Sequence, residues 1–358
     1  KIPILSLDAS YMIQPKTGYI RINRFGATTA EEFKKAMKEL QKQGMKDMIL
    51  DLQGNGGGYL NAAIDLANEF LGQKELIVYT EGRTAKRSDF YAKGNGDFRN
   101  GRLIVLVDEY TASASEIVSG AVQDWDRGII VGRRSFGKGL VQRPIDLPDG
   151  SMIRLTIARY YTPAGRCIQK PYDSSTDYNK DLIERFNHGE LMNADSIHFP
   201  NSLKVQTKKL GRTVYGGGGI MPDYFVPIDT TLYTDYHRNL VAKGVVIKFT
   251  MKFIEGHRKE LAGKYKKFES FNEKFIIDDD MMATLREMGD KEGVKFNEEQ
   301  YQKSLPLIKT QLKALIARDL WDMNEYFRVM NTTNESIQKA LEILNSDEYQ
   351  KKLKVNQH

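Results

Sequence analysis

The pattern of hydrophobic positions between residues 103 and 142 predicts a β-α-β unit. Five consecutive apolar residues at 103–107 are typical of a central strand in a parallel sheet. Apolar residues then recur at helical spacing over residues 114–126, which predicts a helix with one face in the core. Gly128 ends this helix, and a second short strand starts at Ile129. The loops after both strands therefore lie at the carboxyl ends of the sheet, where open α/β sheets usually carry their sites.

The rest of the chain separates into an α/β part and a helical part. Before residue 172, the pattern predicts strands at residues 18–25, 48–52, 77–80 and 153–161, and helices at residues 28–43 and 59–71. Residues 172–210 break the periodicity and are interpreted as an insertion. Helical spacing dominates from about residue 230, with helices expected at residues 281–288, 298–330 and 335–344. We therefore expect a core at residues 1–229 and a helical domain at residues 230–358.

Two candidate catalytic side chains stand in the two loops of the β-α-β unit. Ser113 precedes the predicted helix, so its hydroxyl lies at the positive end of the helix dipole, where an oxyanion is stabilised. Lys138 follows 25 positions later, between two glycines. A lysine acts as a base only when it is neutral, so burial has to lower its pKa from about 10.4 toward 7, which costs roughly 4 to 5 kcal/mol. Gln142 offers an uncharged amide oxygen to orient the amine.

The sequence does not favour a histidine base for Ser113. Its five histidines all lie far downstream in segments without strand-to-loop context: His188, His198, His237, His257 and His358. The G-x-S-x-G pattern of a nucleophile elbow is also absent around Ser113. Lysine is therefore the better candidate for the base.

Two other interpretations of these loops stay open. Ser113 and Glu116 match a capping box, in which the serine only caps the helix. Residues 132–138 match most of a Walker A phosphate loop, but Gly139 replaces the serine or threonine that binds magnesium. The prolines within residues 140–148 also disfavour the helix that a phosphate loop opens. A nucleotide-binding protein is thus a distant alternative.

Residues 51–58 form a glycine-rich turn before the helix predicted at residues 59–71. Backbone N–H groups in such a turn suit an oxyanion, and they suit a phosphate equally well. A tight turn without a ligand is the simpler alternative.

Short motifs follow one another in a fixed order from about Tyr19 to Pro227. They are Asp51-Leu52 with Gly57-Gly58, Ser113-Ala-Ser-Glu-Ile117, Gln123-Asp124, Phe136-Gly-Lys138-Gly139, Val141-Gln142, Tyr161-Thr-Pro-Ala-Gly165-Arg166 and Gly217-Gly-Gly-Ile220. This series resembles the C-terminal processing, or tail-specific, peptidases, which are serine proteases with a Ser/Lys dyad. The resemblance implies that Ser113 is the nucleophile, Lys138 the general base and Gln142 the residue that positions the lysine.

The resemblance also implies an oxyanion hole of backbone N–H groups, which here belong to Gly57, Gly58 and Ala114. Asp124 matches an aspartate near the family's site and is a supporting candidate. Its alternative is a helix-end carboxylate that pairs with Arg127.

The fold implied by the resemblance is α/β, with a crotonase- or ClpP-like core of β-β-α units followed by a helical C-terminal domain. The implied activity is a serine endopeptidase that cleaves polypeptides near their C-terminal ends through an acyl-enzyme. Substrates would be presented by their C-termini, and any self-association would use the helical domain. Similar proteins are usually exported to the bacterial cell envelope or periplasm, and many carry an upstream PDZ domain, for which there is no room before Tyr19. The rival from another class is a catalytically silent peptide-binding scaffold with the same fold.

Composition changes this picture little. The 358 residues are 41% hydrophobic and 28% charged, with a net charge of +6. Lysines are scattered among acids, so we expect a solvated surface and no nucleic-acid partner. The single cysteine, Cys167, excludes an internal disulfide framework. No Cys/His/Asp cluster indicates a metal, and no cofactor is expected. The sequence opens at Lys1 without a signal sequence or a long apolar run.

Overall fold

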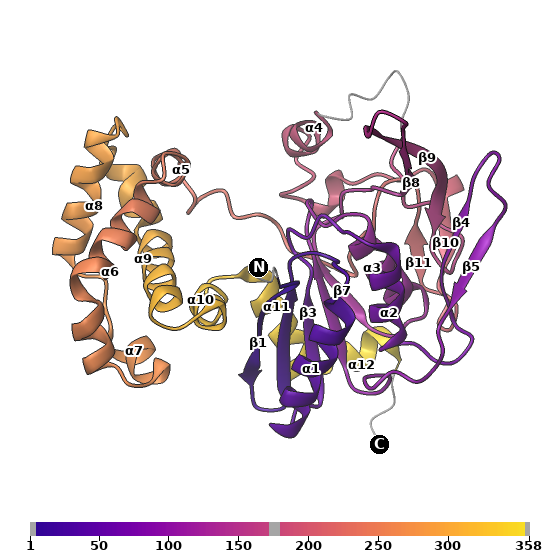
Figure 1. Cartoon of the computed structure of the whole chain (residues 1–358), viewed down its shortest axis with the longest axis horizontal. Helices are drawn as coiled ribbons and strands as arrows, with labels where there is room; N and C mark the ends of the chain where they lie inside the picture. Colours follow the sequence, from indigo (N-terminus) through magenta and orange to yellow (C-terminus); the bar gives the residue numbers. More distant parts are fainter. Residues whose placement is uncertain (1–4, 172–179, 355–358) are drawn as a thin grey trace. The chain divides into compact units, whose positions relative to one another are not determined.

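The structure is a computed structural model that describes residues 5–171 and 180–354 (Figure 1). The chain divides into two units. The first takes in residues up to 227 and from 339 onward, and the second is residues 228–338. Each unit is described by itself below.

The central sheet of the first unit has six strands among the described residues. Their order is β1 (Leu7–Gln14), β2 (Thr17–Ile22), β3 (Asp47–Asp51), β6 (Leu103–Val107), β7 (Ile129–Gly132) and β12 (Tyr224–Phe225). β1 pairs antiparallel with β2, and every other pair is parallel. The strand predicted at residues 103–107 is confirmed, and it lies in the middle of the sheet.

Three helices cover one face of this sheet: α1 (Thr29–Lys42), α2 (Leu60–Asn68) and α3 (Ala114–Asp124). Phe33 of α1 and Phe70, just beyond α2, meet edge to face at 5.7 Å. Every residue of α3 is buried, including its polar ones. α3 therefore packs against the core on all sides, and its N-terminus, next to Ser113, lies inside the first unit.

A second, antiparallel sheet lies in the same unit. Its order is β5 (Ser88–Tyr91), β4 (Leu76–Glu81), β9 (Met152–Tyr161) and β8 (Leu140–Asp146). β8 follows the glycine-flanked lysine directly. The alternation along the end of β9 is clear, because Ala158 and Tyr160 are buried whereas Arg159 is exposed.

The predicted insertion at residues 172–210 is structured where it is described. It carries α4 (Asp181–Asn187), two short 3₁₀ turns and β10 (Lys204–Gln206), which pairs with β11 (Thr213–Tyr215). Residues 172–179 lie outside the described residues.

The last helices of the chain do not belong to the unit in which we expected them. We expected a helical domain over residues 230–358, but α12 (Glu348–Leu353) and most of α11 (Glu335–Asn345) belong to the first unit. The backbone N–H of Leu103 donates to the Tyr349 hydroxyl at 3.0 Å, and the Arg102 guanidinium donates to the Leu344 carbonyl at 2.7 Å. These contacts span more than 240 positions and leave no local pattern in the sequence.

The second unit is a helical bundle. Its helices are α5 (Asp235–Ala242), α6 (Val245–Lys264), α7 (Phe268–Lys274), α8 (Asp279–Lys291), α9 (Glu298–Leu320) and α10 (Met323–Met330). The helix expected over residues 298–330 is broken at Trp321, after which the Asp322 side chain caps α10. Asn297 caps α9 as expected, through the Gln300 N–H at 2.9 Å.

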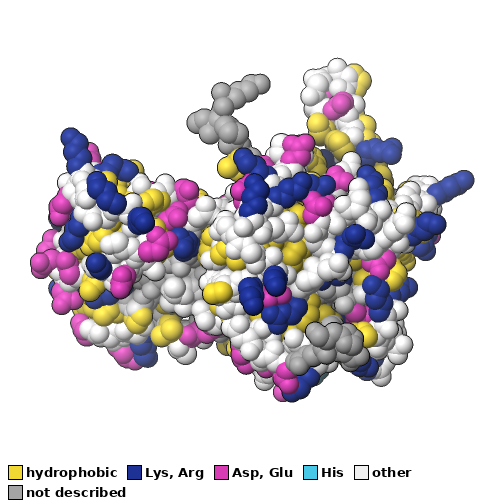
Figure 2. Space-filling view, turned by 90° about the horizontal axis from the view of Figure 1, so that it is seen from below, with side chains coloured by type: hydrophobic (Ala, Val, Ile, Leu, Met, Phe, Trp, Pro, Cys, Tyr) yellow, Lys and Arg dark blue, Asp and Glu magenta, His cyan; other side chains and the backbone are white. Residues whose placement is uncertain are grey.

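On the face of the molecule in Figure 2, basic and acidic side chains are interspersed, with apolar side chains between them. None of the described helices is long and apolar enough to cross a bilayer.

Candidate active site

Ser113 occupies a strained turn between β6 and α3. It is the N-cap of α3, with φ 57° and ψ −114°. A non-glycine residue with positive φ costs energy, so the surrounding contacts must hold it. Ser113 and Glu116 form a capping box, in which the Ser113 N–H donates to Glu116 Oε2 at 2.8 Å. The capping box that the sequence predicted at Ser113 and Glu116 is therefore confirmed.

Glu116 holds Ser113 and the lysine loop together. Its side chain is fully buried and accepts four hydrogen bonds. Oε2 accepts from the N–H groups of Ser113 and Lys138, each at 2.8 Å. Oε1 accepts from the Gly137 N–H at 2.7 Å and the Ser135 hydroxyl at 2.5 Å. The backbone nitrogens of Ser113 and Lys138 share one oxygen, so they lie no further apart than twice 2.8 Å.

The electrostatics of Glu116 are those of a buried carboxyl surrounded by donors. Burial raises its pKa, and the hydrogen bonds from Ser135, Lys138, Gly137 and Ser113 act in the opposite direction. The sequence indicated Glu116 only as the partner in a capping box. Its contacts with Gly137 and Lys138, 21 and 22 positions away, had no sequence signal.

Two glycines shape the lysine loop. Gly137 has φ 84°, and its carbonyl accepts from the Lys170 N–H at 3.0 Å. Gly139 donates to Gln169 Oε1 at 2.9 Å. A Cβ on Gly139 would lie 2.5 Å from the Gln169 backbone nitrogen, so a larger residue would displace the loop.

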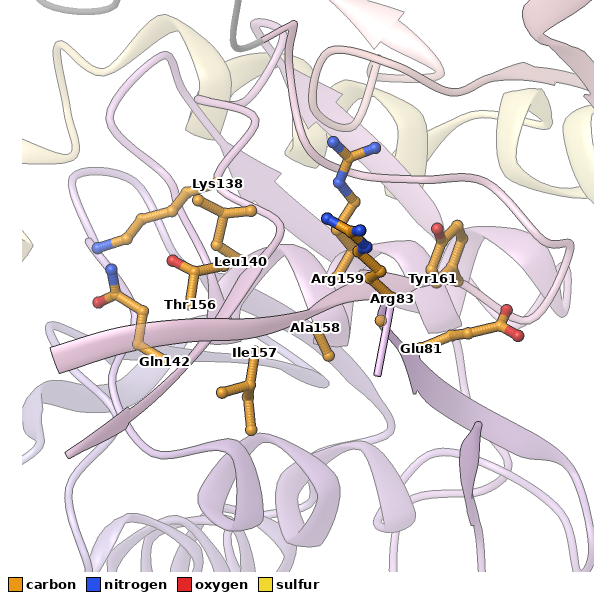
Figure 3. Close-up of a pocket in the computed structure, with 11 residues that line it drawn as sticks. Glu81, Arg83, Lys138, Leu140, Gln142, Thr156, Ile157, Ala158, Arg159 and Tyr161 are labelled. Carbon is orange, nitrogen blue, oxygen red and sulfur yellow. The ribbon is translucent and has the colours of Figure 1, made fainter. Parts of the chain in front are cut away.

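The Lys138 side chain lines an open pocket of about 870 Å³. Gln142 lines the same pocket from β8, and Figure 3 shows both side chains at one end of it. Ser113 is outside this lining, and among the described residues no hydrogen bond joins its hydroxyl to the lysine amine. Catalytic hydrogen bonds are often long in ligand-free structures and tighten when substrate binds.

The glycine-rich turn lies directly against Ser113. A Cβ on Gly57 would lie 2.6 Å from the Ser113 Cβ and 2.9 Å from the Ala114 nitrogen. The Gly57 N–H, however, donates to Asn55 Oδ1 at 2.8 Å, so it is not available to an oxyanion. Within the described residues, the N–H groups of Gly58 and Ala114 have no acceptor.

Asn55 is the second residue that the sequence analysis missed. Its side chain is buried and also donates to the Ile22 carbonyl at 2.8 Å, which ties the turn to β2. An asparagine two residues before a glycine is a recognisable Asx-turn pattern, and that was the available signal.

Asp124 does not pair with Arg127, so that expectation is wrong. Its buried carboxylate pairs with Arg166 at 2.5 Å and accepts from the Ala164 N–H at 2.7 Å. Arg127 instead donates to backbone carbonyls, including that of Phe70 at 3.0 Å. Asp124 thus anchors the turn after β9 to the end of α3, and no described contact links it to Ser113.

The geometry argues against a phosphate at the Walker-like segment. The N–H groups of Gly137 and Lys138, which would cradle a phosphate, donate to a carboxylate. The following segment is the strand β8. Among the described residues, no group of three or more His, Cys, Asp or Glu side chains is arranged to hold a metal ion.

Comparison with known proteins identifies what each part of the chain is similar to. Residues 16–176 match the model of peptidase family S41, and residues 236–322 match a family of unknown function. A carboxyl-terminal-processing protease of Picosynechococcus is 45% identical over 155 residues, which cover 43% of this chain and 37% of that protein. Carboxyl-terminal-processing peptidase 3, chloroplastic, of Arabidopsis thaliana is 36% identical over 211 residues, covering 55% of this chain and 40% of that protein.

The chain therefore spans about two fifths or less of the length of these relatives. Among solved structures, the photosystem II D1 C-terminal processing protease is 28% identical, with a TM-score of 0.45. The aligned part covers 64% of this chain and 50% of that protein.

Proposed function

Because residues 16–176 match the model of peptidase family S41, we propose that this chain is a serine endopeptidase that cleaves polypeptides near their C-terminal ends. One observation carries the proposal. Glu116 Oε2 accepts from the backbone N–H groups of both Ser113 and Lys138, so the two loops with the candidate dyad meet at one atom. Loops on opposite faces of the core would have excluded a dyad, and the shared acceptor keeps these two loops together.

In the proposed reaction, neutral Lys138 accepts the proton of the Ser113 hydroxyl while the serine oxygen attacks the peptide carbonyl. The C–N bond breaks when the lysine returns this proton to the leaving amine, and an acyl-enzyme ester remains. Water, deprotonated by the same lysine, then hydrolyses the ester. Gln142, beside the lysine in the pocket, would orient the amine without adding charge.

We propose that Gly58 and Ala114 donate to the oxyanion, and that Gly57 supports them by its close packing against Ser113. Ala114 opens α3, so its N–H points along the positive end of the helix dipole. Asn55 would keep the turn in place by holding the Gly57 N–H. Asp124 is assigned a structural role at the far end of α3.

We propose that substrates are unfolded polypeptides presented by their C-termini, that the protein acts in the bacterial cell envelope, and that any self-association uses the helical unit. A PDZ domain upstream of residue 1 would capture substrate, as the resemblance implies. The first unit, which takes in residues up to 227 and from 339 onward, would then form the peptidase core with its insertion.

Incubation of the protein with an unfolded polypeptide, followed by mass spectrometry of the products, tests the activity. We expect cleavage by the wild-type chain and by Ser151→Ala, which removes an exposed hairpin serine. We expect none by Ser113→Ala. An active-site serine label provides a second readout, because a scaffold with the same fold would not react with it. Equal cleavage by wild type and Ser113→Ala would overturn the proposal.

A further inference from the structure

The pocket beside Lys138 contains two arginines that the reaction does not use. We propose that Arg83 and Arg159 form a subsite for an acidic side chain of the polypeptide substrate, close to the scissile bond. This inference rests on the proposed function. It adds a selectivity for aspartate or glutamate that neither the family match nor the dyad supplies.

The sheet register places Arg159 close to the dyad. On β9 it lies opposite Glu81 of β4 on one side and opposite Leu140 of β8 on the other. Leu140 is two residues beyond Lys138. Adjacent strands lie about 5 Å apart, and two residues span at most about 7 Å, so the Cα atoms of Lys138 and Arg159 are within about 12 Å. A substrate extended at about 3.3 Å per residue covers this distance in about four residues.

The side chain of Arg159 faces the pocket. Along β9, Ala158 and Tyr160 turn into the core, so Arg159 and Tyr161 project outward by strand alternation. Both of these outward residues line the pocket. Figure 3 shows the guanidinium groups of Arg83 and Arg159 projecting in the same direction, beside Tyr161.

Arg83 is kept close to β9 by its neighbour Gly82. A Cβ on Gly82 would lie 2.1 Å from the Ile157 carbonyl oxygen, so this turn is pressed against the strand. Tyr161 stacks on Tyr79 with ring centroids 4.8 Å apart. Tyr161 of this stacked pair lines the pocket together with the two arginines.

The two arginines are available to a ligand. Neither has an ion pair with a described residue, whereas nearby Arg87 pairs with Asp89 at 2.7 Å and covers the Tyr79 ring. Glu81 also lines the pocket, but it makes no ion pair with Arg159 although the two residues are cross-strand neighbours.

The pocket lining carries two guanidinium groups, those of Arg83 and Arg159, and one carboxylate, that of Glu81, so its net charge is positive. Lys138 adds to this charge when it is protonated. Guanidinium groups bind carboxylates through charge-assisted hydrogen bonds, often in a bidentate manner. Because both arginines are solvent-exposed, we expect a preference of about tenfold in kcat/KM for aspartate over asparagine, weakened by salt.

The test uses peptides whose cleavage site has first been mapped by mass spectrometry. Each peptide carries Asp or Asn at one position within four residues of that site. We expect a preference of about tenfold for Asp at one position or two neighbouring ones in the wild-type chain. Arg159→Gln and Arg83→Gln should each reduce it to less than about threefold without slowing cleavage of the Asn peptide. Arg154→Gln, an exposed arginine on β9 outside the pocket, is the matched control and should keep the preference.

Binding of the same peptides to Ser113→Ala, measured by fluorescence anisotropy, separates this inference from the proposed function. Cleavage with equal rates for Asp and Asn, or a preference that survives in both arginine variants, overturns the subsite. If the wild type cleaves no peptide and no site can be mapped, tighter binding of Asp-containing than of Asn-containing peptides supports the subsite and overturns the peptidase.

Discussion

Replacing Glu116 by glutamine tests the link between the two loops that carry the proposed dyad, Ser113 and Lys138. The carboxylate uses both oxygens, with two donors on each. A glutamine keeps one acceptor oxygen and turns an NH₂ group toward the other two donors. With the NH₂ group at the Oε1 position, the Gly137 N–H loses its acceptor, while the Ser135 hydroxyl can turn and accept; with the NH₂ group at the Oε2 position, the Ser113 and Lys138 N–H groups both lose theirs. Each lost acceptor costs about 1–3 kcal/mol. We therefore expect Glu116→Gln to destabilise the protein by roughly 1–6 kcal/mol.

The same substitution should slow the reaction beyond its effect on stability. In either orientation of the amide, the Lys138 loop loses at least one hydrogen bond to residue 116, and a displacement of about 1 Å in a reacting group can cost about 100-fold in rate. We expect kcat of the folded variant to fall about 100-fold, with a smaller change in KM.

The assay combines thermal unfolding with kcat and KM measured below the unfolding transition. Glu69→Gln is the matched control, because Glu69 is equally buried and accepts the Asp97 N–H at 3.0 Å outside the site. It should lose stability and keep kcat. A folded Glu116→Gln variant with the kcat of the wild type would refute the positioning role.

Three further predictions follow from the structure. Lys138→Ala should abolish hydrolysis and leave the fold intact; a folded Lys138→Ala variant that hydrolyses peptides at the wild-type rate would contradict the dyad. Gly139→Ala should reduce activity at least about tenfold, because the added Cβ would lie 2.5 Å from a backbone nitrogen; unchanged activity would show that the loop adapts. Burial and the neighbouring Asp322 raise the pKa of Glu325 to about 7, above its unfolded value of about 4.5. The folded protein therefore holds this proton more tightly than the unfolded chain, and its free energy of unfolding falls as the pH rises from about 4.5 through 7. Urea unfolding of the full chain should show this loss in the wild type and less of it in Glu325→Gln; equal pH dependence would contradict the assignment.

The sequence by itself determined the elements whose hydrophobic period is long and regular. The strand at residues 103–107 and the helix from residue 114 follow from local patterning, because burial on a sheet or helix face requires that period. The chain order also places the loops of Ser113 and Lys138 at the same sheet edge.

Only the tertiary structure decided which polar groups meet there. Glu116 accepts hydrogen bonds from residues more than 20 positions away along the chain. Asp124 pairs with Arg166, 42 positions further along, and not with nearby Arg127. Asn55 takes the Gly57 N–H that the sequence had assigned to an oxyanion. Buried hydrogen-bond partners are selected by the geometry of the assembled core, and separation along the chain leaves no periodic trace of that choice.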